Sequence, residues 1–125
     1  MPRDTIEQII LRHGQRGMDL LAPGLPEDFC RRAAGAVLSL PRGTVLLTTG
    51  FYVAGFAETD GPSGTWAVAK ALQTLGFRPV MVTDEYSRGF YEPEGIETVY
   101  LSMDASEADC KRILEQYQPV LLFSL

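Results

Sequence analysis

The chain has 125 residues, of which 46% are hydrophobic and 22% are charged, and this composition is typical of one globular domain rather than of a disordered or fibrous chain. Its 16 acidic and 11 basic residues give a formal net charge of −5, so binding to nucleic acid is not expected, because it would need clustered cations. No apolar run has the length of a membrane-spanning helix, and the start of the chain does not resemble a secretory signal, so we expect a cytoplasmic protein without a membrane partner.

Cysteine and histidine are too scarce to carry the chemistry that most often uses them. Cys30 and Cys110 lie far apart in predicted helices, so we expect two buried, reduced thiols rather than a disulfide or a metal site. His13 is the only histidine, which argues against a zinc centre and against a Ser-His-Asp triad. No metal ligand is assigned from these residue types.

The first 40 residues are predicted to be helical. Asp4 is placed to cap a helix over residues 4–13, in which the residues at helical spacing are Ile6, Ile9, Ile10 and His13. A second helix is expected over residues 27–38, before the break at Pro41 to Gly43. Its inner face is predicted to consist of Phe29, Cys30, Ala33, Ala34, Val37 and Leu38.

From residue 44 onward, short apolar runs alternate with helical patterns. Strands are predicted at residues 44–49, 78–83, 97–101 and 119–125, and helices at residues 62–75 and 102–118. The first of these runs is apolar and β-branched throughout, as in a strand that is buried on both faces. Gly76 is placed to end a helix, and Trp66 and Phe77 are expected in the core. The segment from Gly50 to Gly61 is expected to be a loop.

This alternation predicts an α/β fold in three layers, with a mostly parallel sheet of about four strands that is flanked by helices and preceded by N-terminal helices. We expect one domain, with a helical segment at residues 1–40 and βαβ units at residues 44–125. The run 119–125 is almost wholly apolar, like a central strand, and this predicts an incomplete domain that is the N-terminal part of a longer enzyme domain. The alternative is a small complete domain with this strand in the middle of the sheet. If its edge is exposed, the chain is a candidate homo-oligomer.

The segment from Gly50 to Gly64 joins the carboxyl end of the first strand to the next helix, and this is where parallel α/β sheets bind ligands. Pro62 suits the first helical position, because its missing N–H is not needed there. The N–H groups of Gly61, Ser63 and Gly64 are then expected to point outward at the positive end of the helix dipole. This arrangement predicts a site for an anion, either a carboxylate or a phosphate.

Three carboxylates stand beside this predicted anion site. Glu58 and Asp60 are two residues apart, so each can perturb the ionisation of the other, and the pair can act as general acid and base or bind a divalent cation. The simpler interpretation is that Asp60 caps the helix and Glu58 is solvated. Asp84 ends the second strand and is a further site candidate, unless it caps the turn that follows. The chain has neither a G-x-G-x-x-G motif nor a phosphate-binding loop, so an NAD site is not expected.

One stretch of the chain carries a recognisable family pattern. Gly50 is followed by Ala57-Glu58-Thr59-Asp60-Gly61-Pro62-Ser63-Gly64, then by Ala69, Ala71, Leu72, Leu75-Gly76 and the strand Val80 to Asp84. Over residues 43–84 this combination resembles the D-glutamate cyclase family. The resemblance implies a lyase of D-amino acid metabolism that converts D-glutamate to 5-oxo-D-proline and water, in a domain that continues beyond Leu125.

The roles of particular residues are our own hypothesis, because the chemistry of this loop is consistent with the reaction. Glu58 and Asp60 are expected to be the catalytic acid and base, acting on a small amino-acid substrate. The residues expected to bind the substrate are Gly50, Thr59, Gly61, Ser63, Gly64 and Asp84. No cofactor is assigned, although a divalent cation held by Glu58 and Asp60 would serve the same chemistry. The alternative function is a non-catalytic α/β module that binds an anion or a nucleotide through the same loop.

Overall fold

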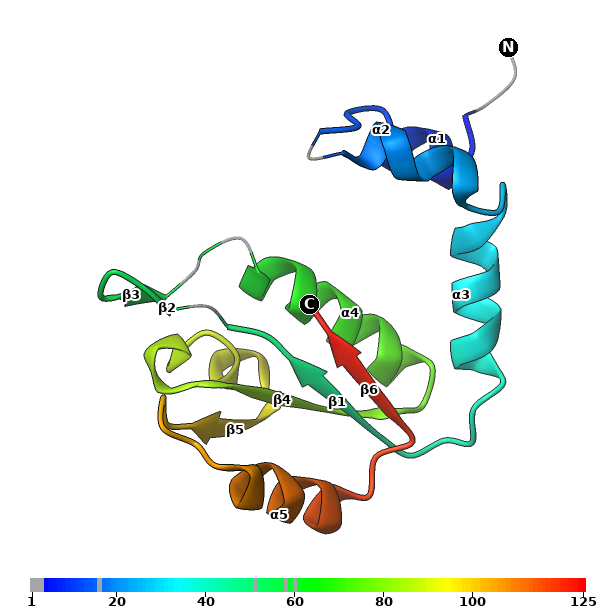
Figure 1. The fold of residues 1–125 in the computed structure, drawn as a ribbon. Helices are drawn as coiled ribbons and strands as arrows, with labels where there is room; N and C mark the ends of the chain where they lie inside the picture. The colour runs from blue at the N-terminus through cyan, green and yellow to red at the C-terminus, as the bar shows by residue number, and fades with distance from the viewer. Residues whose placement is uncertain (1–3, 16, 51, 58, 60) are drawn as a thin grey trace. The chain divides into compact units, whose positions relative to one another are not determined.

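The computed structural model describes residues 4–15, 17–50, 52–57, 59 and 61–125 (Figure 1). By its internal contacts the chain divides into two compact units, Met1–Leu40 and Pro41–Leu125. The first unit is helical, and the second contains the sheet. None of the described helices has the length and apolar character needed to cross a lipid bilayer.

The first unit consists of short helices. They are α1 (Ile6–Ile10), α2 (Met18–Leu21), the 3-10 turn η1 (Ala22–Gly24) and α3 (Phe29–Leu38). Thr5, rather than the predicted Asp4, caps α1: its hydroxyl accepts the N–H of Gln8, and the Gln8 side chain accepts the N–H of Thr5. Asp4 instead forms an ion pair with Arg12. The prediction of Asp4 as the cap was therefore wrong by one residue.

The predicted inner face of α3 is only partly covered. Phe29, Cys30 and Val37 are half-buried, whereas Ala33, Ala34 and Leu38 are exposed, and no described residue of α3 is fully buried. The other helices of this unit have five and four residues, so they offer little surface to pack against. Helix α3 is joined to α1 by a polar contact, in which the N–H of Cys30 donates to Glu7 Oε1 at 3.1 Å.

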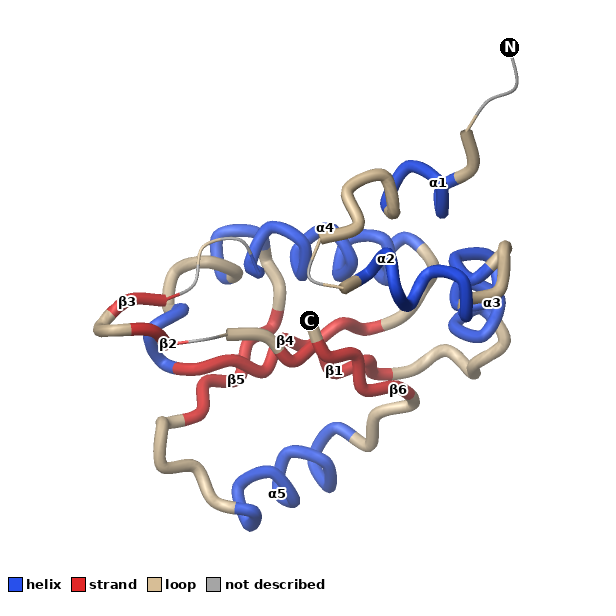
Figure 2. Tube along the Cα trace, turned by 45° about the horizontal axis from the view of Figure 1, so that its top comes forward, coloured by secondary structure: helices blue, strands red, loops and turns tan. Residues whose placement is uncertain are grey.

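The second unit confirms the predicted α/β architecture. Its parallel sheet has the strand order β5-β4-β1-β6, with β1 at Thr44–Thr48, β4 at Arg78–Asp84, β5 at Glu97–Leu101 and β6 at Leu121–Ser124. Helix α4 (Gly61–Thr74) lies on one face of the sheet and α5 (Glu107–Tyr117) on the other (Figure 2). This order is that of the first four strands in a doubly wound fold, and the direction of winding reverses next to β1.

The core lies between the central strands and these two helices. Val45, Leu46 and Leu47 of β1 are at most 1% exposed, as the uninterrupted apolar run predicted. Val80 and Met81 of β4 are buried beside them. The helices add buried residues to this core, namely Ala69 and Leu72 from α4 and Ile113 from α5.

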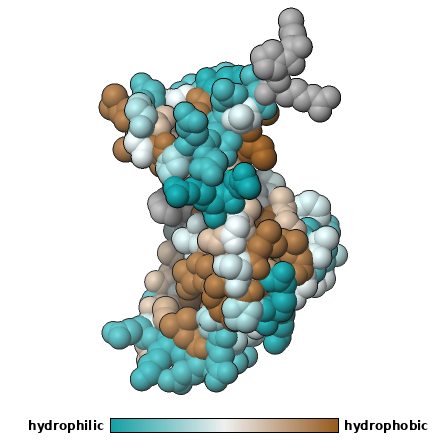
Figure 3. Space-filling view, turned by 90° about the vertical axis from the view of Figure 1, so that its right-hand side faces the viewer, coloured by the Kyte–Doolittle hydropathy of each residue, from teal (hydrophilic) through white to brown (hydrophobic). Residues whose placement is uncertain are grey.

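Strand β6 lies at the edge of the described sheet, not at its centre. It pairs with β1 only, and Leu122 is 53% exposed. After β5, the chain crosses over β4 and β1 and forms β6 on the far side of β1. The position of β6 in the sheet therefore depends on this crossover, and the apolar character of its sequence does not predict it. Leu114 and Leu125 are also exposed. Figure 3, the view onto the side at the right of Figure 1, shows apolar surface among polar residues.

The end of α4 follows the sequence pattern, whereas the burial of Trp66 and of the cysteines does not. Gly76 has φ +84° and ends α4 as predicted, because the N–H of Gly76 and that of Phe77 donate to carbonyls of the last helical turn. Phe77 is buried, but Trp66 is 38% exposed and is not in the core. Both cysteines are unpaired, yet Cys110 is exposed and Cys30 only half-buried, so the prediction of buried thiols was wrong for Cys110.

The segment after β1 is not wholly a loop. It contains an antiparallel hairpin of two short strands, β2 (Tyr52–Val53) and β3 (Phe56–Ala57). The two turn residues, Ala54 and Gly55, both have positive φ, which matches the right-handed twist of a tight hairpin. Helix α4 follows and begins at Gly61, so Pro62 is its second residue rather than its first.

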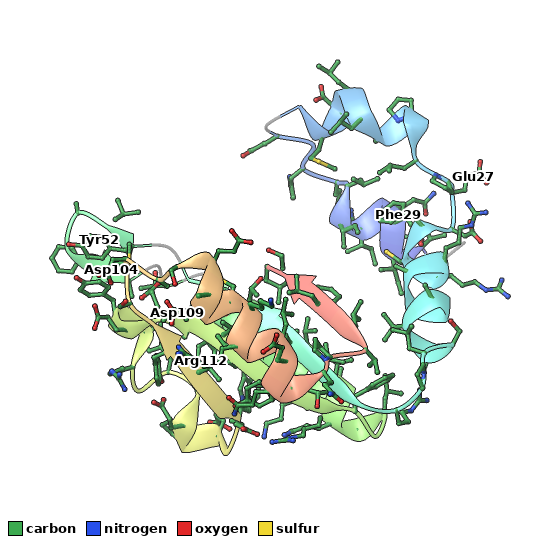
Figure 4. All side chains as sticks on the ribbon, turned by 60° about the horizontal axis from the view of Figure 1, so that its bottom comes forward. Glu27, Phe29, Tyr52, Asp104, Asp109 and Arg112 are labelled. Carbon is green, nitrogen blue, oxygen red and sulfur yellow. The ribbon has the colours of Figure 1, made fainter. Side chains whose placement is uncertain are left out.

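The start of α5 offers a test of local stability. Ser106 accepts the N–H of Asp109 at 3.3 Å, and Asp109 accepts the N–H of Ser106 at 2.9 Å; Figure 4 shows Asp109 with Arg112 on this helix. Ser106→Ala removes this cap and should lower the free energy of unfolding by about 1 kcal/mol, measured by urea denaturation. Ser106→Thr keeps the hydroxyl and should retain most of the stability, and equal loss in both variants would contradict the capping role.

Candidate functional site at the carboxyl edge of the sheet

The ends of β1 and β4 meet at the carboxyl edge of the sheet. Their register pairs Thr48 with Val82, so Gly50 lies opposite Asp84. Gly50 has φ +116°, and a Cβ atom there would stand 2.6 Å from both Asp84 Oδ2 and Thr83 Oγ1. Only glycine fits this backbone conformation and this close approach. The structure thus brings together the predicted site residues Gly50 and Asp84.

The Asp84 side chain is held by the turn that follows it. Its Oδ1 accepts the N–H of Tyr86 at 2.9 Å, and this bond caps the 3-10 turn η2 (Glu85–Ser87). The capping interpretation of Asp84 is therefore confirmed for Oδ1. The other carboxylate oxygen, Oδ2, is directed toward Gly50, so capping and ligand binding do not exclude one another.

A hollow of about 380 Å³ opens over these strand ends, and we call it the edge hollow. Its size suits a small molecule. Its polar side chains come from β1 and the residue after it, from β2, from β4 and from the segment after β5. The residues that line it are Thr48, Thr49, Gly50, Tyr52, Val82, Thr83, Asp84, Leu101, Ser102, Met103 and Ala105.

Two buried hydroxyl groups at this edge have no hydrogen-bond partner among the described residues. They belong to Thr83, which lines the edge hollow and is 3% exposed, and to Tyr91, which is 1% exposed. Burial raises the pKa of Tyr91, whereas the nearby hydroxyls of Thr49 and Thr65 oppose that rise. A buried hydroxyl without a partner costs free energy, so these two groups are unusual features of the fold.

A second hollow, of about 540 Å³, lies at the first turn of α4, and we call it the helix hollow. It is lined by Thr59, Pro62, Ser63, Trp66, Gly89, Phe90 and Glu94. It contains two of the predicted substrate-binding residues, Thr59 and Ser63. Gly61 and Gly64 do not line either hollow.

The described residues of the predicted site are thus divided between the two hollows, with Gly50 and Asp84 in one and Thr59 and Ser63 in the other. Glu58 and Asp60 lie outside the residues that the structure describes, so their pairing, their acid–base role and a cation between them remain predictions. Within the described ranges, no three His, Cys, Asp or Glu side chains are grouped so as to hold a metal ion. Neither hollow is lined by a described lysine or arginine.

Aromatic side chains around the site were not foreseen as a group. Tyr52 of the hairpin stacks on Tyr86 with ring centroids 4.3 Å apart, and Figure 4 shows Tyr52 on this hairpin. The interaction with Tyr52 is the largest cause that raises the pKa of Tyr86. Trp66, which was expected in the core, lines the helix hollow instead. These residues belong to different elements of the fold, so no regular spacing in the sequence indicates that they lie near the site.

Side-chain contacts hold the segment between β4 and β5. The Arg88 guanidinium lies over the ring of Tyr100 at 4.3 Å, and the Tyr100 hydroxyl donates to Glu92, which also accepts the N–H of Gly89. Burial, then the bond to Glu92, raises the pKa of Tyr100 to about 12. Lys70 of α4 donates to the carbonyl of Glu94 at the 3-10 turn η3 (Glu92–Glu94). These contacts fix the wall that carries Gly89, Phe90 and Glu94.

The fold and these hollows define an α/β protein whose candidate ligand site lies at the carboxyl edge of a parallel sheet. The chain belongs to the D-glutamate cyclase-like family: residues 6–114 match the family described as D-glutamate cyclase-like, C-terminal. The match includes both hollows and most of both units, and it confirms the family that the motif around residues 57–64 indicated. The search of curated proteins found no match, and neither did the search of solved structures.

The close approach at Gly50 generates a prediction about stability. Gly50→Ala places a methyl group 2.6 Å from two oxygens at a left-handed φ, so it should lower the free energy of unfolding by more than about 1 kcal/mol. Gly64→Ala is the matched control, because a Cβ there meets nothing within 4 Å in a helix. That variant should be as stable as the wild type or more stable. Thermal unfolding of both variants measures the difference, and equal melting temperatures would contradict the steric argument.

Proposed function

We propose that this chain carries out the reaction that gives its family its name, the cyclisation of D-glutamate to 5-oxo-D-proline with loss of water. The observation that carries the proposal is the family match over residues 6–114. The hollows at the carboxyl edge of the sheet support it, because they lie where α/β folds bind small molecules. The proposed setting is D-amino acid metabolism.

The reaction joins two groups of one molecule. A bond forms between the α-nitrogen and the γ-carboxyl carbon, and a bond between that carbon and one carboxyl oxygen breaks. The nitrogen of the ammonium group loses two protons, and the departing oxygen gains two protons and leaves as water. Because both reacting groups belong to one substrate, holding it in a folded conformation supplies a large part of the rate enhancement.

The proton transfers need a group that can both accept and donate protons. We propose Glu58 and Asp60 for this role, because carboxylates near an anion-binding helix start suit general acid–base work. Thr59 and the N–H groups of Gly61, Ser63 and Gly64 are proposed to hold a substrate carboxylate or the oxyanion of the tetrahedral intermediate. A divalent cation on Glu58 and Asp60 is the alternative source of charge stabilisation.

The test is to incubate the chain with D-glutamate and to follow 5-oxo-D-proline by chiral chromatography. Asp60→Asn should lower the rate by at least about 100-fold if Asp60 transfers a proton, and Glu58→Gln reports on the other carboxylate in the same way. Glu115→Gln is the control, because Glu115 is an exposed residue of α5. Addition of EDTA to the wild type tests the alternative in which a divalent cation takes part.

Two outcomes would contradict parts of this proposal. No product from D-glutamate would contradict the cyclase function of this chain. Product formation that is unchanged in both carboxylate variants would remove Glu58 and Asp60 from the mechanism. Calorimetric titration with nucleotides and with D-glutamate separates an enzyme of this class from a non-catalytic module that binds phosphate.

We also propose a cytoplasmic location and self-association of the chain. Two unpaired cysteines are typical of proteins from a reducing compartment, and β6 has an exposed edge. Sedimentation velocity should show a species larger than the monomer. Leu122→Lys, which places a charge on the exposed edge strand, should shift it to the monomer, whereas Gln116→Lys on α5 should not. A wild-type chain that is monomeric at every concentration would contradict self-association.

A further inference from the structure

We propose that the edge hollow binds the ammonium group of an amino-acid substrate, through Asp84 Oδ2 and the buried hydroxyl of Thr83. This inference rests on the proposed function for the nature of the substrate. It adds an assignment of which substrate group is bound and by which atoms. The assignment uses neither of the carboxylates at positions 58 and 60.

The charge of the edge hollow favours a cation. Its described lining contains one carboxylate, that of Asp84, and several hydroxyl groups, but no lysine or arginine. The net field of such a lining is negative, so a phosphate or carboxylate is disfavoured and an ammonium is attracted. The lining also includes the apolar side chains of Val82, Leu101 and Met103.

The Asp84 carboxylate is already oriented for this role. Its hydrogen bond from the Tyr86 N–H uses Oδ1 and fixes the side chain at the end of β4. Oδ2 then faces the point above Gly50 where a side chain would begin, at 2.6 Å. An oriented carboxylate loses little conformational entropy when it accepts a charged hydrogen bond, which is the arrangement that makes such bonds strong.

The hydroxyl of Thr83 supplies the second, independent observation. It is buried, it lies 2.6 Å from the same point above Gly50, and it has no hydrogen-bond partner among the described residues. A fold rarely leaves such a group unsatisfied, and a bound group that supplies the missing hydrogen bond is one explanation. An ammonium carries three donors and no acceptor, so it can donate to Thr83 Oγ1 and to Asp84 Oδ2 together.

The absence of a side chain at Gly50 is a further feature of this site. Any larger residue would place its Cβ against both oxygens, so only glycine lets the end of β1 approach Thr83 and Asp84 this closely. The identity of residue 50 is thus explained by the acceptors and by the positive φ at the same time. No other described glycine has a Cβ position this close to two polar side-chain atoms.

The test compares two ligands that differ in one group. D-Glutamate and D-2-hydroxyglutarate have the same carboxylates, but the second has a hydroxyl in place of the ammonium. The full chain should bind D-glutamate at least about 10-fold more tightly by calorimetry, because hydrogen bonds to charged groups are the stronger ones. Asp84→Asn removes the negative charge and should abolish this preference, whereas its amide oxygen can still accept the N–H of Tyr86.

A second pair of variants separates ligand binding from folding. Thr83→Val and Tyr91→Phe each remove one buried hydroxyl that has no partner among the described residues, so neither should lower the melting temperature. Thr83→Val should reduce the preference for D-glutamate by about 3-fold or more, because only Thr83 lines the edge hollow. Tyr91→Phe should leave the preference unchanged.

The outcomes distinguish this inference from the proposed function. A preference for the amine that survives in both Asp84→Asn and Thr83→Val would overturn the inference, as would a wild-type chain that binds both ligands equally or neither. Cyclisation of D-glutamate with an unchanged KM in both variants would overturn it while the proposed function stands. A preference that is lost in these variants, in a chain that never forms 5-oxo-D-proline, would support the amine site and contradict the proposed function.

Discussion

The close approach of Gly50 to the end of β4 is the constraint on which the candidate site depends. It follows from the parallel register of β1 and β4, which sets residue 50 opposite residue 84. Both strands are central and buried, so neither can slip without exposing its apolar residues. The core thereby fixes the relative positions of a glycine, a hydroxyl and a carboxylate that belong to separate segments of the chain.

The two hollows have similar described linings. Each contains one carboxylate, that of Asp84 in the edge hollow and that of Glu94 in the helix hollow, and the helix hollow also lies at the first turn of α4. The segment that joins β1 to α4 contributes Gly50 to one and Thr59 to the other. An α/β fold places both hollows beside the first crossover, because the loop after β1 leads directly into the first turn of the next helix.

Much of the second unit could be predicted because its signals are local. The buried run in β1, the glycine that ends α4 and the alternation of strands and helices all lie within short windows of sequence. The failures have more than one cause. Trp66 was placed in the core from apolar character alone, but its exposure depends on which elements lie alongside it. The cap at Thr5 was missed by one residue because Asp4 and Thr5 are equally good caps until the backbone selects one.

The sequence by itself determined the class of fold, the family and the acidic, glycine-rich segment after β1, since these depend on periodicity and on residues that are close in the chain. Only the tertiary structure decided that Gly50, Thr83 and Asp84 meet at one point, that the Thr83 hydroxyl is left without a partner among the described residues, and that the candidate binding residues divide between two hollows. The physical reason is that strand register and burial are properties of the packed sheet. Asp84 looks the same in the sequence whether it caps a turn or faces a ligand, and the structure assigns one oxygen to the cap and directs the other toward Gly50.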